Sequence, residues 1–256
     1  MQSLISIIIV TYNRKKLLIK AIDSVLRQKF SDFELIIIDD SSTDNTEEAV
    51  KKYLADRRIK YVKIAKSKSI AQARNAAWPY VSGGYVAVLD SDDVWCDDLK
   101  LSKQFNFLEN NSDFIAVGSG AVLINEQDKI LDYVVKPELD ADIRKDFFTK
   151  NPFFHSSVMF RYGPIKEIGG YDEKIKFGED LDFLLRLGQK GKFYNFPEAM
   201  INYRIHSDNE IKKHWLGAVI DVLRIIKKNR KIYNAGPSIF FKKIFRKFFE
   251  YFKSKN

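Results

Sequence analysis

The sequence predicts an α/β fold built on a mostly parallel sheet that is flanked by helices. Short runs of apolar, β-branched residues alternate with segments whose apolar residues recur at helical spacing. The first of these runs are apolar at nearly every position, as in strands that are covered on both faces. At 256 residues and 45% hydrophobic composition, the chain is long enough to bury the core that such a sheet requires.

The elements can be placed in order along the chain. Strands are expected at residues 4–10, 33–38, 59–64 and 85–90, with helices at 14–28, after residue 44 and at 69–78. Asp44 and Glu47 have the spacing of a capping box, so Asp44 is expected to open the second helix. After Asp93 the rhythm changes, and we expect a helix near 97–108, a strand near 114–124, then further helices and strands to about residue 203.

The net charge of +9 is concentrated near the C-terminal end. Residues 212–256 contain 13 Lys and Arg residues but only two acidic ones, so the remainder is near neutral. We therefore separate a domain of residues 1–210 from a basic amphipathic helical tail of residues 211–256. One side of the helix predicted after Pro237 carries four phenylalanines, Phe241, Phe245, Phe248 and Phe252. Such a helix favours the interface of an anionic membrane, and the alternative is packing on the body or on a second subunit.

Two further observations bear on the compartment. The apolar run at residues 4–10 is too short for a signal peptide or a membrane span, and no basic segment precedes it. The single cysteine, Cys96, fits a reducing compartment and is expected to fill the core. We expect a cytoplasmic protein that the tail holds peripherally on the inner face of the cell membrane.

Polar residues follow three of the predicted parallel strands where each strand ends, as TYN, DDSS and DSDD. The carboxyl ends of parallel strands meet at one edge of a sheet, where ligands bind. Asp90, Asp92 and Asp93 would repel one another unless a cation lay among them, and carboxylate oxygens suit Mg²⁺ or Mn²⁺. The alternative for DSDD is a solvated turn with a helix cap. Asp40 is expected to contact a nucleobase or a ribose, whereas Asp39 faces back into the structure.

The usual glycine loops for phosphate are missing from the sequence. The VGSG segment lacks the third glycine of a dinucleotide fingerprint, and no GxxxxGK occurs. Phosphates would therefore need a metal ion and arginines, for which Arg74 in SIAQARNAAW is a candidate.

Several short motifs, taken together and in order, resemble the inverting nucleotide-sugar glycosyltransferases of family 2. They are IIIVTYNR, FELIIIDDSSTDNT, AQARNAA, YVAVLDSDD, IGGYDE, FGEDLDFLLRL and YRIH, and they span roughly residues 4–210. The resemblance implies the A-type glycosyltransferase fold, with a Rossmann-like sheet. Residues 1–95 would bind the nucleotide sugar, and residues 96–210 would form the acceptor side.

The same resemblance implies an activity. A hexosyl group would pass, with inversion, from a nucleotide-sugar donor, expected to be a UDP-sugar, to a saccharide or a lipid-linked saccharide. Mn²⁺ or Mg²⁺ would be the cofactor, and the product would serve bacterial cell-surface polysaccharide or lipopolysaccharide synthesis. No specific nucleic acid is expected as a partner.

The resemblance also assigns residues to the donor. Thr11 and Tyr12 would line the base pocket, with Tyr12 against the uracil ring, and Asp40 would bind the base. Arg74 would bind the diphosphate region, and Asp90 would touch the ribose or the sugar.

The predicted metal ligands come from two distant parts of the chain. Asp92 would hold the metal that bridges the two phosphates, and Asp93 would share that role. His206 stands where related enzymes place a histidine near the metal or the diphosphate, and Arg204, two residues earlier, would contact the donor.

The second acidic cluster would be catalytic. Direct displacement needs a base within hydrogen-bond reach of the acceptor hydroxyl. Asp180 matches the base of the family, with Glu179 beside it. The alternative is that these residues only begin a helix, where acidic side chains are favoured, and both can hold.

Two other classes remain open at this stage. Nucleotidyltransferases acting on sugar phosphates also combine a parallel sheet with metal-binding carboxylates, but they have no need of a base at Glu179 and Asp180. A non-enzymatic membrane- or nucleic-acid-binding module would depend on the basic tail alone.

Overall fold

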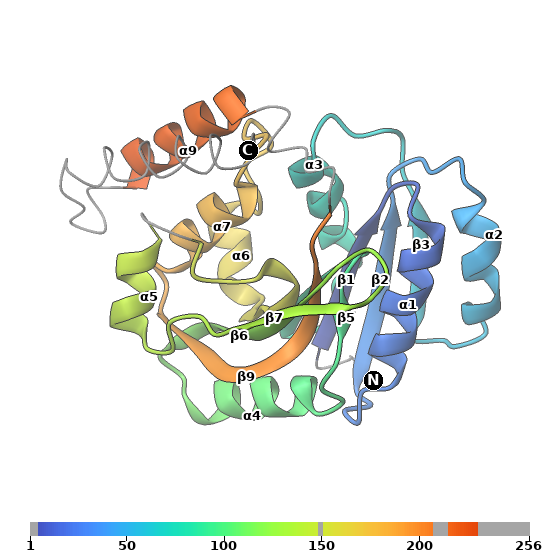
Figure 1. Cartoon of the computed structure of the whole chain (residues 1–256), viewed down its shortest axis with the longest axis horizontal. Helices are drawn as coiled ribbons and strands as arrows, with labels where there is room; N and C mark the ends of the chain where they lie inside the picture. Colours follow the sequence, from blue (N-terminus) through green and yellow to red (C-terminus); the bar gives the residue numbers. More distant parts are fainter. Residues whose placement is uncertain (1–4, 148–150, 207–214, 230–256) are drawn as a thin grey trace.

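One mixed sheet of nine strands runs through the described part of the chain (Figure 1). The computed structural model describes residues 5–147, 151–206 and 215–229. The strands are hydrogen-bonded in the order β3-β2-β1-β4-β8-β6-β9-β5, and β7 pairs with β6. Strands from both halves of the sequence therefore share one sheet, with β4 of the first half bonded to β8 of the second.

The first four strands are the predicted ones, and they are parallel. Their bounds are β1 (Ile5–Thr11), β2 (Phe33–Asp39), β3 (Ile59–Lys63) and β4 (Tyr85–Asp90). In the register of this sheet, Thr11 is paired with Asp39, and Val10 is paired with Asp90. The ends of β1, β2 and β4 therefore lie side by side, as the sequence predicted.

Helices cover both faces of these strands; they are α1 (Lys15–Leu26), α2 (Thr46–Val50), with the 3-10 turn η1 (Lys51–Tyr53), and α3 (Ile70–Asn75). Ile7 and Ile9 of β1 share an apolar cluster with Leu18 of α1. Ile8 belongs to the other cluster, with Ala73 of α3. Because successive strand residues point to opposite faces, a strand covered on both sides must be apolar throughout.

Helix α2 begins later than predicted. Asn45, in the left-handed conformation with φ 62°, precedes the helix and makes no side-chain cap. The carboxylate of Asp44 instead accepts hydrogen bonds from the backbone N–H of Lys15, at 2.9 Å, and from the Thr46 hydroxyl. The predicted capping box is therefore wrong, because Asp44 ties this loop to the start of α1.

The second half adds mainly antiparallel pairs to the sheet. After the 3-10 turn η2 (Trp78–Tyr80), its elements are β5 (Val94–Trp95), α4 (Lys100–Asn110), β6 (Phe114–Ile124), β7 (Ile130–Val134), α5 (Asp140–Asp146), η3 (His155–Ser157), β8 (Met159–Arg161), α6 (Gly163–Ile168), α7 (Glu179–Leu187) and β9 (Lys192–Arg204). The long strand β9 runs parallel to β6 along its whole length. The helix and strand predicted near 97–108 and 114–124 are confirmed as α4 and β6.

Helix α9 (Trp215–Asn229) packs against α7, within the range predicted as the basic tail. Val222, Ile225 and Ile226 join the apolar cluster that contains Leu181 of α7. The phenylalanine-rich segment predicted after Pro237 lies outside the described residues. Among the helices that the structure describes, none is long and apolar enough to cross a membrane.

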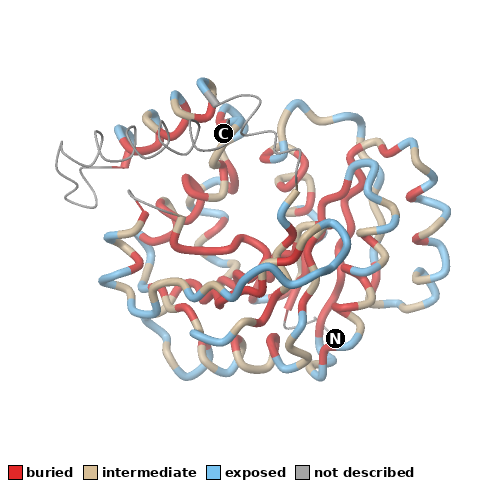
Figure 2. Tube along the Cα trace, in the orientation of Figure 1, coloured by how far each residue is buried: buried red, intermediate tan, exposed pale blue. Residues whose placement is uncertain are grey.

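Buried residues concentrate in the strands, as Figure 2 shows. Cys96 is exposed, so the prediction that it fills the core is wrong. Its neighbour Trp95 takes the core position and is fully buried. Consecutive residues of an extended segment point to opposite sides, which turns Cys96 outward.

Candidate active site

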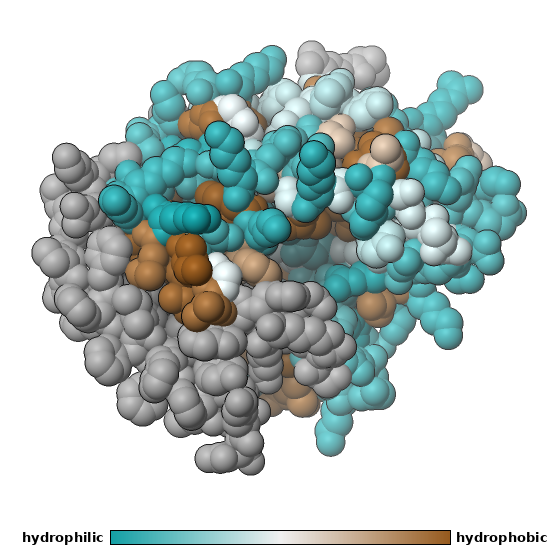
Figure 3. Space-filling model, turned by 90° about the horizontal axis from the view of Figure 1, so that it is seen from above, coloured by the Kyte–Doolittle hydropathy of each residue, from teal (hydrophilic) through white to brown (hydrophobic). Residues whose placement is uncertain are grey.

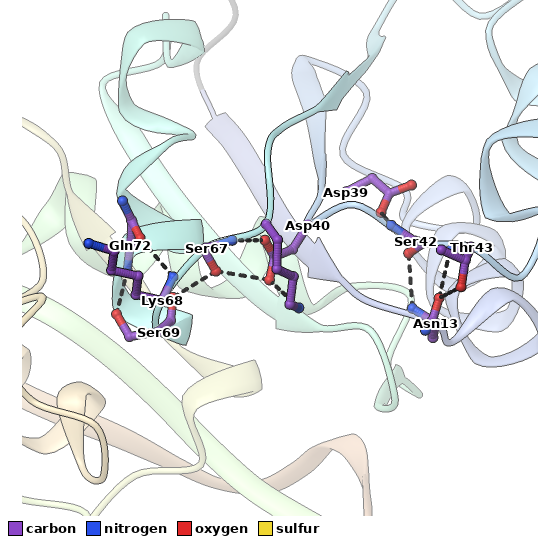
Figure 4. A network of polar contacts seen from close by, with 10 residues as sticks. Asn13, Asp39, Asp40, Ser42, Thr43, Ser67, Lys68, Ser69 and Gln72 are labelled. Carbon is purple, nitrogen blue, oxygen red and sulfur yellow. Dashed lines mark hydrogen bonds and ion pairs between the residues drawn. The ribbon is translucent and has the colours of Figure 1, made fainter.

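Asp40, just beyond β2, lies in a dense polar network (Figure 4). Its Oδ1 accepts a hydrogen bond from the backbone N–H of Ser67 at 2.6 Å, and its Oδ2 accepts one from the Ser67 hydroxyl at 2.8 Å. The ammonium of Lys66 is also 2.8 Å from Oδ2. Sequence analysis missed both partners, although they follow the third predicted strand at the same edge of the sheet.

Tyr12 and Thr11 stand at the end of β1 next to this network. The ring of Tyr12 is 45% exposed, and the ammonium of Lys66 lies over it, 3.1 Å from the ring centroid. Thr11 is buried, and its hydroxyl has no hydrogen-bond partner among the described residues. The structure therefore brings the three predicted base-pocket residues together.

Hydrogen bonds within the protein hold the turn after Asp40. Asp39 is fully buried and accepts hydrogen bonds from the Ser42 N–H, at 2.8 Å, and from the Tyr61 hydroxyl. Two hydrogen bonds join Asn13 to this turn: its N–H donates to the Ser42 hydroxyl, and its side-chain oxygen accepts from the Thr43 N–H. Figure 4 shows this arrangement, which fixes the backbone beside Tyr12.

Arg74 links the DSDD loop to the second acidic cluster. Its guanidinium is buried and donates to Asp90 at 2.7 Å and to Glu179 at 2.5 Å. Burial raises the pKa of Asp90, but the charge of Arg74, its hydrogen bond and electrostatic interactions with His155 and Arg14 together outweigh burial, so that pKa lies below its ordinary value. Burial raises the pKa of Glu179 to about 7, against the influence of Arg74 and with some repulsion from Asp180.

Asp92 and Asp93 have different surroundings. Oδ2 of Asp92 is 2.5 Å from the Arg14 guanidinium and 2.7 Å from Nε2 of His206. Asp93 is buried and accepts hydrogen bonds from the Ser156 hydroxyl, at 2.5 Å, and from the backbone N–H of Arg204, at 2.8 Å. Burial, and then repulsion from the neighbouring aspartates, raises the pKa of Asp93 well above its ordinary value.

These contacts decide which side chains fit a metal ion. Asp92 and His206 converge from distant parts of the chain and offer an oxygen and a nitrogen ligand, which suits a cation that takes its remaining ligands from phosphate and water. Both oxygens of Asp93 are already used within the protein. No cluster of three or more His, Cys, Asp or Glu ligands is found in the described ranges. Asp92 and His206 thus fit a metal bound together with a substrate.

Arg204, at the end of β9, holds neighbouring backbone in place. Its guanidinium donates to the carbonyl oxygens of Asp92, at 2.9 Å, and Asn125, at 2.7 Å, and to the Asp128 carboxylate, at 2.6 Å. Direct contact with the donor, predicted for Arg204, stays a prediction. Its observed contacts join the DSDD loop to the turn before β7.

Asp180 is presented at the start of α7. Gly178, with φ 82°, precedes the helix in a conformation that favours glycine. Asp180 is partly exposed and accepts a hydrogen bond from the side-chain amide of Asn151 at 2.7 Å, whereas Glu179 is turned inward to Arg74. Only one of the two neighbouring carboxylates is therefore both oriented and accessible.

His155 and Tyr171 lie beneath these carboxylates. Nε2 of His155 is 3.0 Å from the Tyr171 hydroxyl, and both residues are buried. Burial, and then the charge of Arg74, lowers the pKa of His155 to about 4, so its ring is neutral at pH 7. In the IGGYDE motif, Gly169 and Gly170 have φ of 76° and 69°, in the left-handed region that favours glycine.

On the face of the molecule seen from above, the described residues are mostly hydrophilic and surround a hollow near the centre (Figure 3). The edge of the sheet combines an aromatic ring, a metal-compatible pair and an accessible carboxylate. Such a set can hold a base, a diphosphate and a hydroxyl to be deprotonated.

Comparison with known proteins identifies the family. Residues 6–169 match the family described as Glycosyl transferase family 2. An uncharacterized glycosyltransferase of Methanocaldococcus jannaschii is 33% identical over 252 residues, which cover 94% of this chain and 85% of that protein. A shorter match, 42% identical over 113 residues and 44% of each chain, is to WfgD of Escherichia coli, a UDP-Glc:alpha-D-GlcNAc-diphosphoundecaprenol beta-1,3-glucosyltransferase.

Solved structures share the fold. TarS of S. aureus in complex with UDP-GlcNAc matches 87% of this chain with a TM-score of 0.70 at 19% identity. The mannosyltransferase PcManGT from Pyrobaculum calidifontis, in complex with GDP-Man and Mn²⁺, matches 89% with a TM-score of 0.64 at 16% identity. This chain spans slightly less than two thirds of each, 66% and 64%. The chain belongs to glycosyltransferase family 2 and has the A-type glycosyltransferase fold.

Proposed function

We propose that the protein transfers a hexosyl group from a UDP-sugar to a hydroxyl of a lipid-linked saccharide, with inversion and with a divalent metal ion. The observation that carries this proposal is the position of Asp180. It is the accessible carboxylate of the pair at the start of α7, and Arg74 and Glu179 tie this pair to the donor-side residue Asp90.

The donor would lie across the ends of β1, β2 and β4. Thr11, Tyr12 and Asp40 would receive the base, and Asp90 the ribose or the sugar. Two similar proteins support a UDP-sugar as the donor. TarS was solved in complex with UDP-GlcNAc, and the name of WfgD gives UDP-Glc as its donor.

Asp92 and His206 would hold Mn²⁺ or Mg²⁺ beside the diphosphate. When bound, such an ion neutralises charge that develops on the departing phosphate oxygen. The guanidinium of Arg14, on the same oxygen of Asp92, lies where it would add to that stabilisation. We propose that Asp93 positions the DSDD loop and does not bind the metal directly, because its two oxygens accept hydrogen bonds from the Ser156 hydroxyl and the Arg204 N–H. Arg74 would support the diphosphate region indirectly, through Asp90.

Asp180 would act as the base. The acceptor oxygen forms a bond to the anomeric carbon while the bond from that carbon to the phosphate oxygen breaks. The hydroxyl proton passes to Asp180, and the nucleoside diphosphate leaves from the opposite face, which inverts the centre. Asn151 would keep the carboxylate oriented toward the acceptor. Glu179 contributes through Arg74, without contact to the reacting atoms.

The acceptor and the location are part of the same proposal. WfgD acts on a sugar linked to diphosphoundecaprenol, which supports a lipid-linked acceptor and a role in cell-surface polysaccharide synthesis. The basic tail would bring the catalytic domain to the anionic inner face of the membrane. Family membership favours sugar transfer over both the nucleotidyltransferase and the non-enzymatic module.

A donor screen tests the proposal. UDP-, GDP- and dTDP-sugars are incubated with the protein and Mn²⁺, and nucleoside diphosphate release is measured with and without EDTA. UDP release that EDTA suppresses is expected. Sugar 1-phosphate in place of a nucleoside diphosphate would indicate nucleotidyl transfer, and failure of every donor to bind or react would refute the transferase function.

A further inference from the structure

Lys66 covers the predicted base pocket. Its ammonium contacts the Asp40 carboxylate at 2.8 Å and lies 3.1 Å from the centroid of the Tyr12 ring. The side chain of Lys66 is 50% exposed, so it can change rotamer without disturbing the core. The motifs of the family resemblance do not include this residue.

A base cannot stack on this face of Tyr12 while the ammonium remains there. Atoms of stacked rings lie about 3.5 Å apart, which is the space that Nζ now fills. A lysine has a flexible four-carbon stem and three donors, so Nζ can move to the ring edge and keep its contact with Asp40. The base would then replace the ammonium on the ring.

Of the described residues that contact Asp40, Lys66 has donors to spare. The N–H of Ser67 is directed to the Asp40 carboxylate, and its one hydroxyl proton is shared between that carboxylate and the carbonyl oxygen of Ser69. Lys66 donates one proton there and retains two others. Oδ1 of Asp40 accepts one hydrogen bond and has a second lone pair, so the pocket offers an acceptor next to a charged donor, Lys66.

Uracil matches this pair, because it presents an N–H next to a carbonyl on one edge. In the same pose, cytosine presents a ring nitrogen without a proton and an amino group, which is the opposite pattern. We propose that Lys66 determines nucleobase specificity: it leaves the ring of Tyr12 when the donor binds, stays on Asp40 and donates to the base carbonyl. This inference rests on the proposed function of the site as a donor site.

The test compares UDP and CDP binding by calorimetry in the full-length protein and in Lys66→Met. Both ligands carry the same diphosphate, so the general attraction of a lysine for phosphate cancels in their affinity ratio. We expect wild type to prefer UDP and Lys66→Met to reduce the UDP-to-CDP ratio by about tenfold, the effect of one hydrogen bond to a charged group. Lys68→Met, an equal charge change at an exposed neighbour, is the matched control and should keep the ratio.

The possible results separate the two proposals. If Lys66→Met weakens UDP and CDP equally, or changes neither, Lys66 does not read the base and this inference fails while the donor site stands. If wild type binds neither UDP nor CDP, the proposed function fails with it. Lys66→Gln, which keeps neutral N–H donors, should retain part of the ratio, and thermal unfolding of each variant separates loss of fold from loss of specificity.

Discussion

Arg74 is the residue on which the geometry of the two acidic clusters depends. It is 6% exposed and is shared by Asp90 and Glu179, which belong to different halves of the sequence. A buried ion pair contributes little net stability, but removal of one partner leaves the other charge buried and uncompensated. The main effect of removing Arg74 would therefore be that Asp90 and Glu179 lose their counter-charge.

We expect Arg74→Gln to lower the free energy of unfolding by about 3–5 kcal/mol, because the buried carboxylate of Glu179 and the partly buried one of Asp90 would lose their counter-charge. Urea denaturation measures the change. Arg58→Gln is the control, since Arg58 pairs with Asp56 at the surface and exposed pairs contribute about 0–1 kcal/mol. Equal losses in the two variants would show that Arg74 does not act as a buried bridge.

The raised pKa of Glu179 makes the stability of the protein depend on pH. Its pKa is about 7 in the folded protein, above the ordinary value of 4.5, so the folded state binds this proton more tightly than the unfolded state. The contribution of Glu179 to stability is therefore fully present below about pH 4.5 and falls as the pH rises to about 7, by about 3 kcal/mol.

Glu179→Gln should remove this contribution. Its stability should equal that of wild type near pH 4.5 and exceed it near pH 8, as measured by urea denaturation at both values. A constant difference between the two proteins across this range would mean that Glu179 does not titrate there.

The strand ends that carry the candidate site residues were easier to predict from the sequence than the hydrogen-bond partners of those residues. The ends of β1, β2 and β4 could be found because apolar runs stop abruptly at polar residues. Asp93 lies 63 residues from Ser156 and 111 from Arg204, so its hydrogen bonds depend on tertiary pairing that no local pattern carries. Lys66 and Ser67 are close in sequence to the third strand, but serine and lysine in a loop carry no specific signal.

At the scale of elements, the start of α7 fixes the proposed base. Gly178 has φ 82°, and a Cβ there would strain the backbone. We expect Gly178→Ala to destabilise the protein by about 1–3 kcal/mol and to lower kcat more than it changes the KM for the donor, because Asp180 shifts with the helix. Gly163→Ala, at the first residue of α6 where a Cβ meets open space, is the control. An unchanged kcat in Gly178→Ala would show that the conformation of Gly178 does not position Asp180 for the reaction.

The elements that sequence reasoning missed are the short ones. Strands β5 and β8 have two and three residues, too few to show an alternation of apolar and polar positions. They form only because β9 and β4 offer free edges to pair with. The elements of the first half were predictable because β1 and β2 are runs of mainly apolar residues and α1 repeats apolar residues at helical spacing over 12 residues.

At the scale of the whole molecule, α9 packs on α7 and on the segment before it. Asp221 accepts hydrogen bonds from the N–H groups of Lys176 and Phe177, which lead into α7. Lys228 pairs with Asp172 and with the buried Asp182. We therefore propose that the catalytic unit extends beyond residue 210, to the end of α9.

Two truncated chains test this extension. A chain that ends at residue 236 should keep the unfolding temperature and UDP release of the full chain but lose binding to anionic phospholipid vesicles. A chain that ends at residue 210 should unfold at lower temperature and lose turnover, because Val222, Ile225 and Ile226 each contribute about 1.5–3 kcal/mol by burial and the segment before Gly178 loses Asp221. If the chain that ends at residue 210 stays folded and active, the domain boundary at 210 is right and α9 is an accessory helix. If the chain that ends at residue 236 still binds vesicles, another surface makes the membrane contact.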